Sequence, residues 1–194
     1  MNPPNILTFA LQVTKIFEQS GIPYYLGGSI ASSLFGIPRT TLDIDIVVDI
    51  RQHHIPLLIK SFSEKEYYLD SDAMTDAIKH GTSFNIIHRD TFYKIDVFVP
   101  QDDLFQKEVF TRRMKHNLSN EIQDSLFFPS PEDIVLLKLK WYKAGGNVSE
   151  KQWTDILGVL KAQGNHLDRE YMTKWSDYLG IKDLLAKSIL DSGL

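Results

Sequence analysis

The chain has 194 residues, of which 43% are hydrophobic and 24% charged, and its formal net charge is −4. These values are ordinary for a globular protein, and they exclude a dedicated binder of duplex DNA, which would be strongly basic. The absence of cysteine excludes disulfides, thiolate nucleophiles and zinc–sulfur sites. No apolar run is long enough to span a membrane and the N-terminus does not resemble a signal peptide, so we expect a cytoplasmic protein without membrane contact.

The first predicted elements are a helix, a strand and a glycine-rich turn. Asn5–Ser20 has apolar residues at three- and four-residue spacing, which predicts an amphipathic helix packed on a sheet. Tyr24–Leu26 is apolar and typical of a strand end, and after Gly27-Gly28-Ser29 the run Ile30–Phe35 predicts a second helix. Glycines let a backbone approach a phosphate, and a helix N-terminus presents free N–H groups. We therefore predict a phosphate-binding turn, with the Ser29 hydroxyl as a further donor.

Arg39 and Thr41 stand directly before an acidic segment. A guanidinium matches phosphate oxygens in a fork, which predicts that Arg39 reaches a triphosphate. An exposed loop arginine is the alternative.

The next predicted strand, Leu42–Val48, carries two acidic residues. Side chains alternate between the faces of a strand, so Asp43 and Asp45 are expected on one face and the apolar residues on the other. A shared divalent cation, Mg²⁺ or Mn²⁺, would offset the repulsion between the carboxylates. The alternative is a strand end whose carboxylates face solvent. Asp49 falls where the strand ends, and we expect it to be a surface residue or to lie behind the metal ligands.

A third candidate carboxylate lies in a predicted hairpin. Ser83–Ile87 and Phe92–Val99 are predicted as its strands, joined by a turn over His88–Thr91. Asp96 shares one face with Lys94, opposite an apolar face. A lone acid in so apolar a strand is a candidate metal ligand, with an edge-strand aspartate facing water as the alternative.

The middle of the chain is less regular. Leu104–Asn117 is mixed and holds a basic cluster, which could meet phosphates or form a solvated face. Glu121–Phe128 predicts one more strand, ending at Pro129. The change in composition there predicts an α/β core over 1–129 and a helical region over 130–194 packed on it.

The helical region contains one notable lysine. Ile134–Tyr142 is apolar nearly all round, which predicts a buried helix, and Lys138 lies on its buried face. A buried lysine needs an anion, which a nucleotide phosphate or one of the three aspartates could supply. The alternative is a lysine that snorkels at the edge of the core. Downstream, Ser149 to Gln152 forms a capping box that begins another helix.

The turn and the acidic pair together resemble the DNA polymerase β-like nucleotidyltransferase superfamily. Its pattern is an apolar residue, glycine and glycine or serine, then a spacer, then two carboxylates that alternate with apolar residues. Here Leu26-Gly27-Gly28-Ser29 is followed by thirteen residues and then by Asp43-Ile44-Asp45-Ile46. Either Gly27-Gly28 or Gly28-Ser29 is the matching pair. The superfamily also has a third carboxylate on a neighbouring strand, which Asp96 supplies, and the helical C-terminal part resembles that of small bacterial members.

The resemblance implies an α+β fold with a mixed, twisted sheet flanked by helices, and a nucleotide cleft between the sheet and the C-terminal helices. It implies that Asp43, Asp45 and Asp96 bind two Mg²⁺ or Mn²⁺ ions. The activity implied is transfer of a nucleoside monophosphate from a nucleoside triphosphate to an acceptor hydroxyl on a small molecule, a tRNA or a protein. We predict that six residues bind the nucleotide: Gly27, Gly28, Ser29, Arg39, Thr41 and Lys138.

Two other functions stay open at this stage. One is a toxin–antitoxin component that modifies tRNA or a partner protein. The other is a module that binds a nucleotide without turnover. The sequence names neither the base nor the acceptor.

Overall fold

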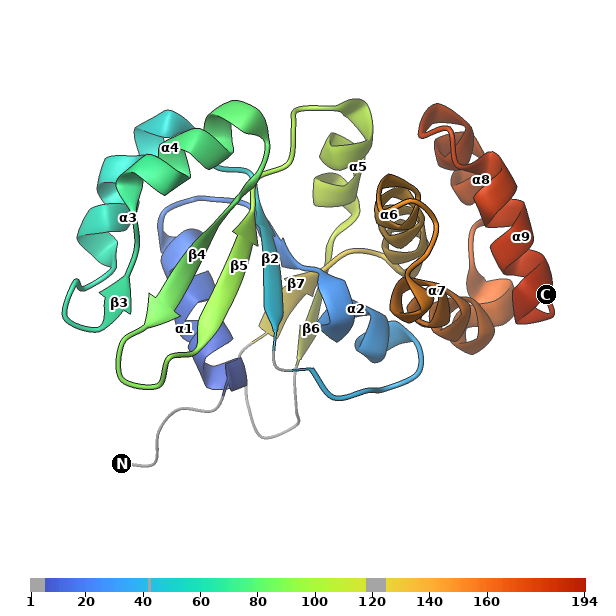
Figure 1. Cartoon of the computed structure of the whole chain (residues 1–194), viewed down its shortest axis with the longest axis horizontal. Helices are drawn as coiled ribbons and strands as arrows, with labels where there is room; N and C mark the ends of the chain where they lie inside the picture. Colours follow the sequence, from blue (N-terminus) through green and yellow to red (C-terminus); the bar gives the residue numbers. More distant parts are fainter. Residues whose placement is uncertain (1–5, 42, 118–124) are drawn as a thin grey trace. The chain divides into compact units, whose positions relative to one another are not determined.

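The structure is a computed structural model that describes residues 6–41, 43–117 and 125–194, and it divides into two compact units (Figure 1). The first unit comprises the described residues up to Leu26 together with Thr41–Phe128, and it holds the sheets. The second comprises Gly27–Thr40 and Pro129–Leu194, and it is helical. The sequence analysis assigns Gly27–Thr40 to a core over 1–129, whereas in the structure this segment groups with the C-terminal helices.

The described residues of the first unit form a mixed five-stranded sheet in the order β1-β2-β5-β4-β3 and a separate antiparallel pair, β6-β7. Strands β2 and β5 run parallel, while the other neighbours in the large sheet run antiparallel. This architecture confirms the predicted α+β fold with a mixed sheet. The strands are β1 (Tyr24–Leu26), β2 (Ile44–Val48), β3 (Tyr67–Tyr68), β4 (Ser83–His88), β5 (Lys94–Phe98), β6 (Met114–Asn117) and β7 (Ser125–Phe128).

The two central strands bury one face and leave the other partly open. In β2 and β5 the buried side chains alternate with half-buried or exposed ones, as the sequence pattern predicts. Asp45 and Asp96 are both half-buried and lie on the more open face. The buried side chains of the two strands are Ile44, Ile46, Val48, Ile95 and Val97.

Helix α1 covers the sheet from behind in the view of Figure 1. The ring of Phe9 lies 6.2 Å from that of Tyr67 on β3 and 5.8 Å from that of His88 on β4. Burial of a side chain of this size stabilises the fold by about 1.5–3 kcal/mol. The helices of this unit are α1 (Ile6–Gln19), a 3₁₀ turn (Gln52–His54), α3 (Ile55–Ser61), α4 (Ser71–His80) and α5 (Leu104–Arg112).

One detail of this unit differs from the sequence expectations, and another extends beyond the described residues. The basic segment Leu104–Asn117 was expected to be less regular, but helix α5 and strand β6 occupy most of it. Asp103 caps α5 by accepting a hydrogen bond from the backbone N–H of Gln106. The strand predicted over Glu121–Phe128 is described only as β7, since residues 121–124 lie outside the described part of the chain.

The second unit is built around α7. Helix α2 packs against α6 and α7, and α9 packs against α7 as well. The backbone after α2 comes very close to α7, because a Cβ added to Gly36 would lie 2.8 Å from the backbone N of Val159 and 2.9 Å from the carbonyl carbon of Gly158. This approach ties Gly27–Thr40 to the C-terminal helices. The helices are α2 (Gly28–Phe35), α6 (Pro131–Ala144), α7 (Glu150–Gln163), a 3₁₀ turn (Gly164–His166), α8 (Arg169–Tyr178) and α9 (Lys182–Ser192).

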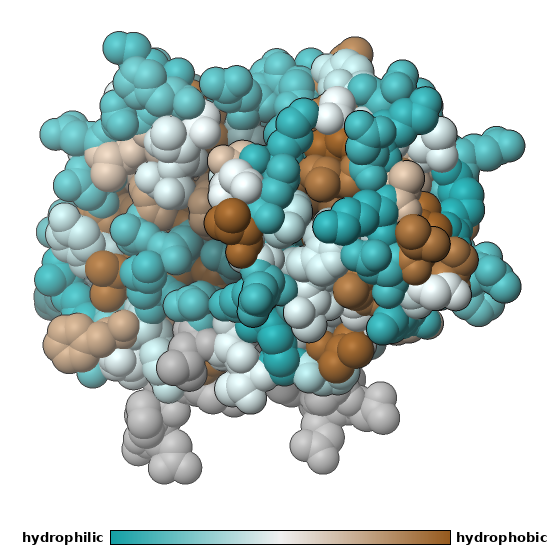
Figure 2. Space-filling view, turned by 45° about the vertical axis from the view of Figure 1, so that its right-hand side comes forward, coloured by the Kyte–Doolittle hydropathy of each residue, from teal (hydrophilic) through white to brown (hydrophobic). Residues whose placement is uncertain are grey.

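The surface in Figure 2 is mostly hydrophilic, with hydrophobic residues gathered in small separate patches. Scattered exposed apolar residues are normal on a protein surface. Of the helices in the described residues, none has both the length and the apolar character needed to span a bilayer.

Candidate functional site

Two glycines with different backbone conformations form the turn that begins α2. Gly27 is the N-cap residue with φ −108°, and the helix receives no hydrogen bond from an N-cap side chain. Gly28 has φ +54°, in the left-handed region where a residue with a side chain is strained. The first N–H groups of α2 are therefore not satisfied by a cap, which is the arrangement that binds an anion.

Arg39 is held against this turn by both its backbone and its side chain. The hydroxyl of Ser33 accepts from the backbone N–H of Arg39 at 3.3 Å and donates to its carbonyl oxygen at 3.4 Å. The guanidinium donates through Nη2 to the Oγ of Ser29, a side chain that is itself buried. Arg39 is thus no free loop arginine, and it directly contacts the predicted phosphate-binding serine.

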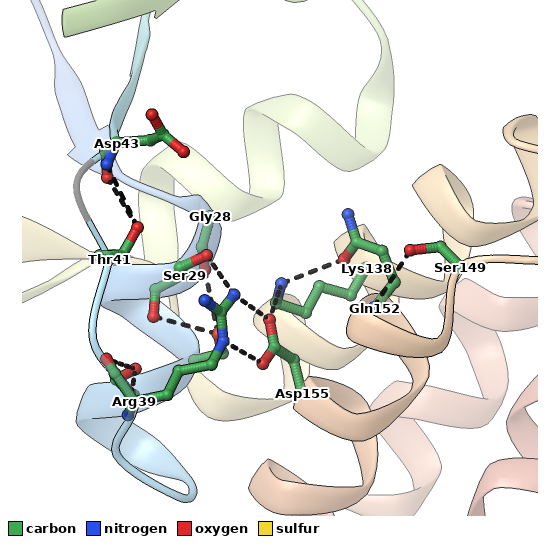
Figure 3. A network of polar contacts seen from close by, with 11 residues as sticks. Gly28, Ser29, Arg39, Thr41, Asp43, Lys138, Ser149, Gln152 and Asp155 are labelled. Carbon is green, nitrogen blue, oxygen red and sulfur yellow. Dashed lines mark hydrogen bonds and ion pairs between the residues drawn. The ribbon is translucent and has the colours of Figure 1, made fainter. Parts of the chain in front are cut away.

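Asp155 on α7 joins Arg39 to Lys138 (Figure 3). Its Oδ1 accepts from Arg39 Nε at 2.8 Å, and its Oδ2 accepts from Arg39 Nη2 and Lys138 Nζ, each at 2.9 Å. Lys138 also donates to Oε1 of Gln152 at 3.1 Å. Burial alone would raise the pKa of Asp155, but the hydrogen bonds from Arg39 and Lys138 outweigh it and hold the pKa below its usual value. The carboxylate is therefore ionised at neutral pH.

Lys138 is buried, as the sequence predicts, with 6% of the residue exposed. The anion beside it is Asp155, which was not among the expected partners, a phosphate or one of the three aspartates. Asp155 lies four residues before the buried Val159 and shares its face of α7. That position, together with a buried lysine in need of an anion, was the signal available in the sequence.

The acidic residues of the first unit meet where β2 and β5 run parallel. Asp45 and Asp96 stand directly opposite each other in the register of the two strands. Residues that are paired in register on neighbouring strands project to the same face of the sheet. Two carboxylates are thus side by side on the more open face.

Asp43 departs from the expected strand geometry. The strand was predicted from Leu42, a residue outside the described ones, but β2 begins at Ile44, so Asp43 lies in the preceding segment and is exposed. The hydroxyl of Thr41 accepts from the backbone N–H of Asp43 and donates to its carbonyl oxygen, both at 3.3 Å. Such local bonds compete with the strand ladder, which accounts for the late start of β2.

Lys94 supplies a positive charge to this acidic group. Its Nζ lies 2.9 Å from Oδ1 of Asp96, and the two side chains are 47% and 24% exposed. The hydrogen bond to Asp96 raises the pKa of Lys94, and the charges of Asp43 and Asp45 raise it further. Lys94 thus lies in the field of all three aspartates. The sequence places Lys94 on the face of Asp96 but does not single it out.

The three aspartates offer carboxylate oxygens only, and oxygen atoms are the ligands that a hard divalent cation prefers. The side chains as they stand are not arranged as a metal site, since no group of three or more Asp, Glu, His and Cys in the described residues could hold an ion. Two observations account for this: Asp96 is bound to Lys94, and Asp43 lies outside the strand. The ion pair uses Oδ1 of Asp96, so a metal at this carboxylate would either share it with Lys94 or displace the lysine.

The structure thus gathers the predicted residues into two groups, one in each compact unit. The helical unit holds one group, and the sheet unit holds the other. Asp155, Gln152 and Lys94 join them as residues that the sequence analysis did not assign. The first group is Gly27, Gly28, Ser29, Arg39 and Lys138; the second is Thr41, Asp43, Asp45 and Asp96.

No family model matches the chain, and no curated protein is similar enough to match it. Solved structures are similar to it. One is the lincosamide antibiotic adenylyltransferase LnuA with lincomycin bound, at 16% identity and a TM-score of 0.51 over 81% of this chain and 96% of that one. Another is an antigenic nucleotidyltransferase-like protein from Paracoccidioides brasiliensis, at 17% identity and a TM-score of 0.52 over 95% and 91%.

A third similar structure is the antibiotic-resistance factor ANT(2'')-Ia, at 11% identity and a TM-score of 0.52 over 93% of this chain and 97% of that one. Each comparison covers most of both chains. At these identities the similarity concerns the fold alone, which the chain shares with these three structures.

Proposed function

We propose that this protein is a metal-dependent nucleotidyltransferase, which transfers a nucleoside monophosphate from a nucleoside triphosphate to an acceptor hydroxyl. The observation that carries the proposal is the register of β2 and β5, which sets Asp45 opposite Asp96 on the open face of the sheet. The fold and the uncapped glycine turn at Gly28 support it further. Like charges on directly opposite residues destabilise a sheet, and a cation bound between Asp45 and Asp96 would offset this repulsion.

In this proposal Asp43, Asp45 and Asp96 hold Mg²⁺ or Mn²⁺. The metal would neutralise charge on the transferring phosphate and activate the acceptor hydroxyl. The backbone at Gly27 and Gly28, with the hydroxyl of Ser29, binds phosphate oxygens. These residues act by positioning and by charge neutralisation, and no covalent enzyme intermediate is needed.

Three further residues complete the proposed nucleotide site. Arg39 donates directly to the phosphates, because its guanidinium already lies against Ser29. Thr41 acts through the backbone of Asp43, to which its hydroxyl is bonded. Lys138 acts through Asp155, which it binds at 2.9 Å.

The acceptor class is a small molecule, a tRNA or a protein. Small hydroxyl-bearing molecules are the first class to test, because the solved adenylyltransferase LnuA has lincomycin bound. The test incubates the protein with each labelled nucleoside triphosphate, Mn²⁺ and a fractionated cell extract. Pyrophosphate release and mass spectrometry of the products then report transfer and identify the acceptor.

Variants of the paired aspartates test the proposal directly. Asp45→Asn and Asp96→Asn should each lower transfer about a hundredfold or more, since a metal ion contributes several kcal/mol to such a reaction. Asp49→Asn is the matched control: Asp49 follows the same strand and is bound by Arg51 at 3.0 Å on the surface. Transfer that survives in both Asp45→Asn and Asp96→Asn would refute the metal site.

A nucleotide-binding module without turnover is the second candidate. The observation that favours it is the ion pair between Lys94 and Asp96, which occupies the third carboxylate. For this function we expect triphosphate binding by calorimetry without pyrophosphate release in either Mg²⁺ or Mn²⁺. Release of pyrophosphate that depends on Asp96 would exclude it.

A further inference from the structure

A buried carboxylate in the helical unit joins two cations beside the glycine turn. The side chain of Asp155 is 5% exposed, that of Lys138 8% and that of Arg39 26%. Taking charges out of water costs free energy that their mutual attraction only partly offsets, so a buried ion cluster is weak evidence for a purely stabilising role. The position of the cluster next to Ser29 points to a role in ligand binding.

The contacts of Asp155 set the direction of the Arg39 guanidinium. Three of its five N–H donors are used, one from Nε and one from Nη2 to Asp155 and one from Nη2 to Ser29. The group is planar and rigid, so fixing one edge also fixes where the two N–H groups of Nη1 point. Ser33 holds the Arg39 backbone as well. Arg39 is therefore ordered before any ligand arrives.

The same contacts orient the hydroxyl of Ser29. Its Oγ accepts from Arg39, so its own hydrogen is directed to another acceptor. Ser29 lies in the first turn of α2, where backbone N–H groups are not capped by a side chain. A hydroxyl hydrogen, backbone N–H groups and a guanidinium edge are the donors that a phosphate chain requires.

We propose that Asp155 is a positioning residue, which holds Arg39 so that Nη1 and the Ser29 hydroxyl bind the phosphate chain of the triphosphate. This inference rests on the proposed function and assigns an additional residue to its nucleotide site. Pre-ordering the arginine lowers the entropy cost of binding. Lys138 has a supporting part, because it keeps Asp155 ionised and fixed.

The sign of one substitution separates positioning from simple electrostatics. Asp155→Asn removes a negative charge beside two cations, so a role that is only electrostatic leaves the affinity for a triphosphate unchanged or raises it. Positioning predicts the opposite, because Asn cannot hold both Nε and Nη2 of Arg39 as a carboxylate does. We expect weaker binding by about ten- to a hundredfold, the effect of one charge-assisted hydrogen bond.

The probe is inorganic tripolyphosphate with Mg²⁺, measured by titration calorimetry on the full chain, because it carries the phosphates without a base. Asp177→Asn is the matched control, since it makes the same change of charge in the same unit at an exposed ion pair, 3.9 Å from Lys182. The affinity of Asp177→Asn for tripolyphosphate should equal that of the wild type. Unchanged or tighter binding in Asp155→Asn overturns the inference.

A second variant guards against misfolding of Asp155→Asn. Arg39→Lys keeps the charge and leaves the Asp155–Lys138 pair in place, but it lacks the planar fork. We again expect a loss of about tenfold or more in affinity at an unchanged melting temperature, and wild-type affinity would overturn the inference.

If the wild type itself binds no tripolyphosphate and no nucleoside triphosphate, the proposed function fails together with the inference. If the wild type binds and the variants do not differ from it, only the inference fails.

Discussion

Lys94 is the cation beside the acidic group for which we propose a metal. Its ammonium binds Asp96 and lies in the field of Asp43 and Asp45. Like charges on neighbouring strands are destabilising, and a cation beside them offsets part of that effect. A divalent ion would neutralise the same carboxylates. Lys94 and a metal are therefore expected to compete for Asp96.

This competition predicts the behaviour of Lys94→Gln. Without metal, the variant should lose up to about 1 kcal/mol of stability, because the ion pair is half exposed. With Mn²⁺, its melting temperature should rise more than that of the wild type, and chelation by EDTA should reverse the rise. Thermal melts with and without Mn²⁺ measure both effects.

Lys65→Gln is the control, because Lys65 is exposed on the surface of the same unit. An equal Mn²⁺-induced rise in Lys94→Gln, Lys65→Gln and the wild type would contradict the competition. At the residue scale, then, the face shared by Lys94 and Asp96 follows from strand alternation. Their ion pair depends on rotamers that no periodicity encodes.

At the scale of elements, the close approach of Gly36 to α7 keeps Gly27–Thr40 in the helical unit. A Cβ at Gly36 would lie 2.8 Å from two backbone atoms, Ser32 O and Val159 N, and backbone cannot move aside as a flexible side chain can. In the sequence, Gly36-Ile37-Pro38 directly follows the helix predicted over Ile30–Phe35, and glycine and proline there are typical of a helix end. The tertiary structure adds that the glycine is needed for space.

Gly36→Ala should accordingly destabilise the protein by about 1–3 kcal/mol, the usual cost of overpacking. Because Arg39 follows three residues later, the substitution should also weaken tripolyphosphate binding. Gly145→Ala is the control: its φ is −83° and an added Cβ would meet only ordinary contacts at 3.5 Å and beyond. Denaturant unfolding measures both variants, and equal stability of the two would contradict the close approach.

At the scale of the whole molecule, the helical unit is discontinuous in sequence. The predicted region 130–194 lacks α2, which packs against α6 and α7 in the structure. Without Gly27–Thr40, the buried Asp155 also loses Arg39 as a partner and keeps only the ion pair with Lys138. The unit is therefore expected to need both of its segments.

A fragment of residues 130–194 should consequently show helical circular dichroism without a cooperative thermal transition. Joining residues 27–40 to it through a Gly/Ser linker should restore a cooperative melt, since the buried face of α7 is covered again. A sharp, two-state melt of the shorter fragment would support the continuous boundary at Pro129 instead.

The local features of this protein follow from the amino-acid sequence alone. The alternation of Ile44, Asp45 and Ile46 predicted a half-buried strand, and Asp96 was placed on the open face of its strand in the same way. The glycine turn, the buried helix around Lys138 and the helical C-terminal part also followed from the sequence. These features depend on neighbours within a few residues, and side-chain periodicity and backbone freedom record them directly.

How these segments pair and pack is seen first in the folded chain. In the parallel pairing of β2 with β5, Asp45 lies opposite Asp96, although the two residues are about 50 positions apart in the sequence. The pairing of Lys138 with Asp155, and the grouping of Gly27–Thr40 with the C-terminal helices, are likewise contacts between distant segments. Such contacts depend on packing and on loop closure, and many alternative pairings share the same local patterns. A single sequence contains the partners but does not say which of them will meet.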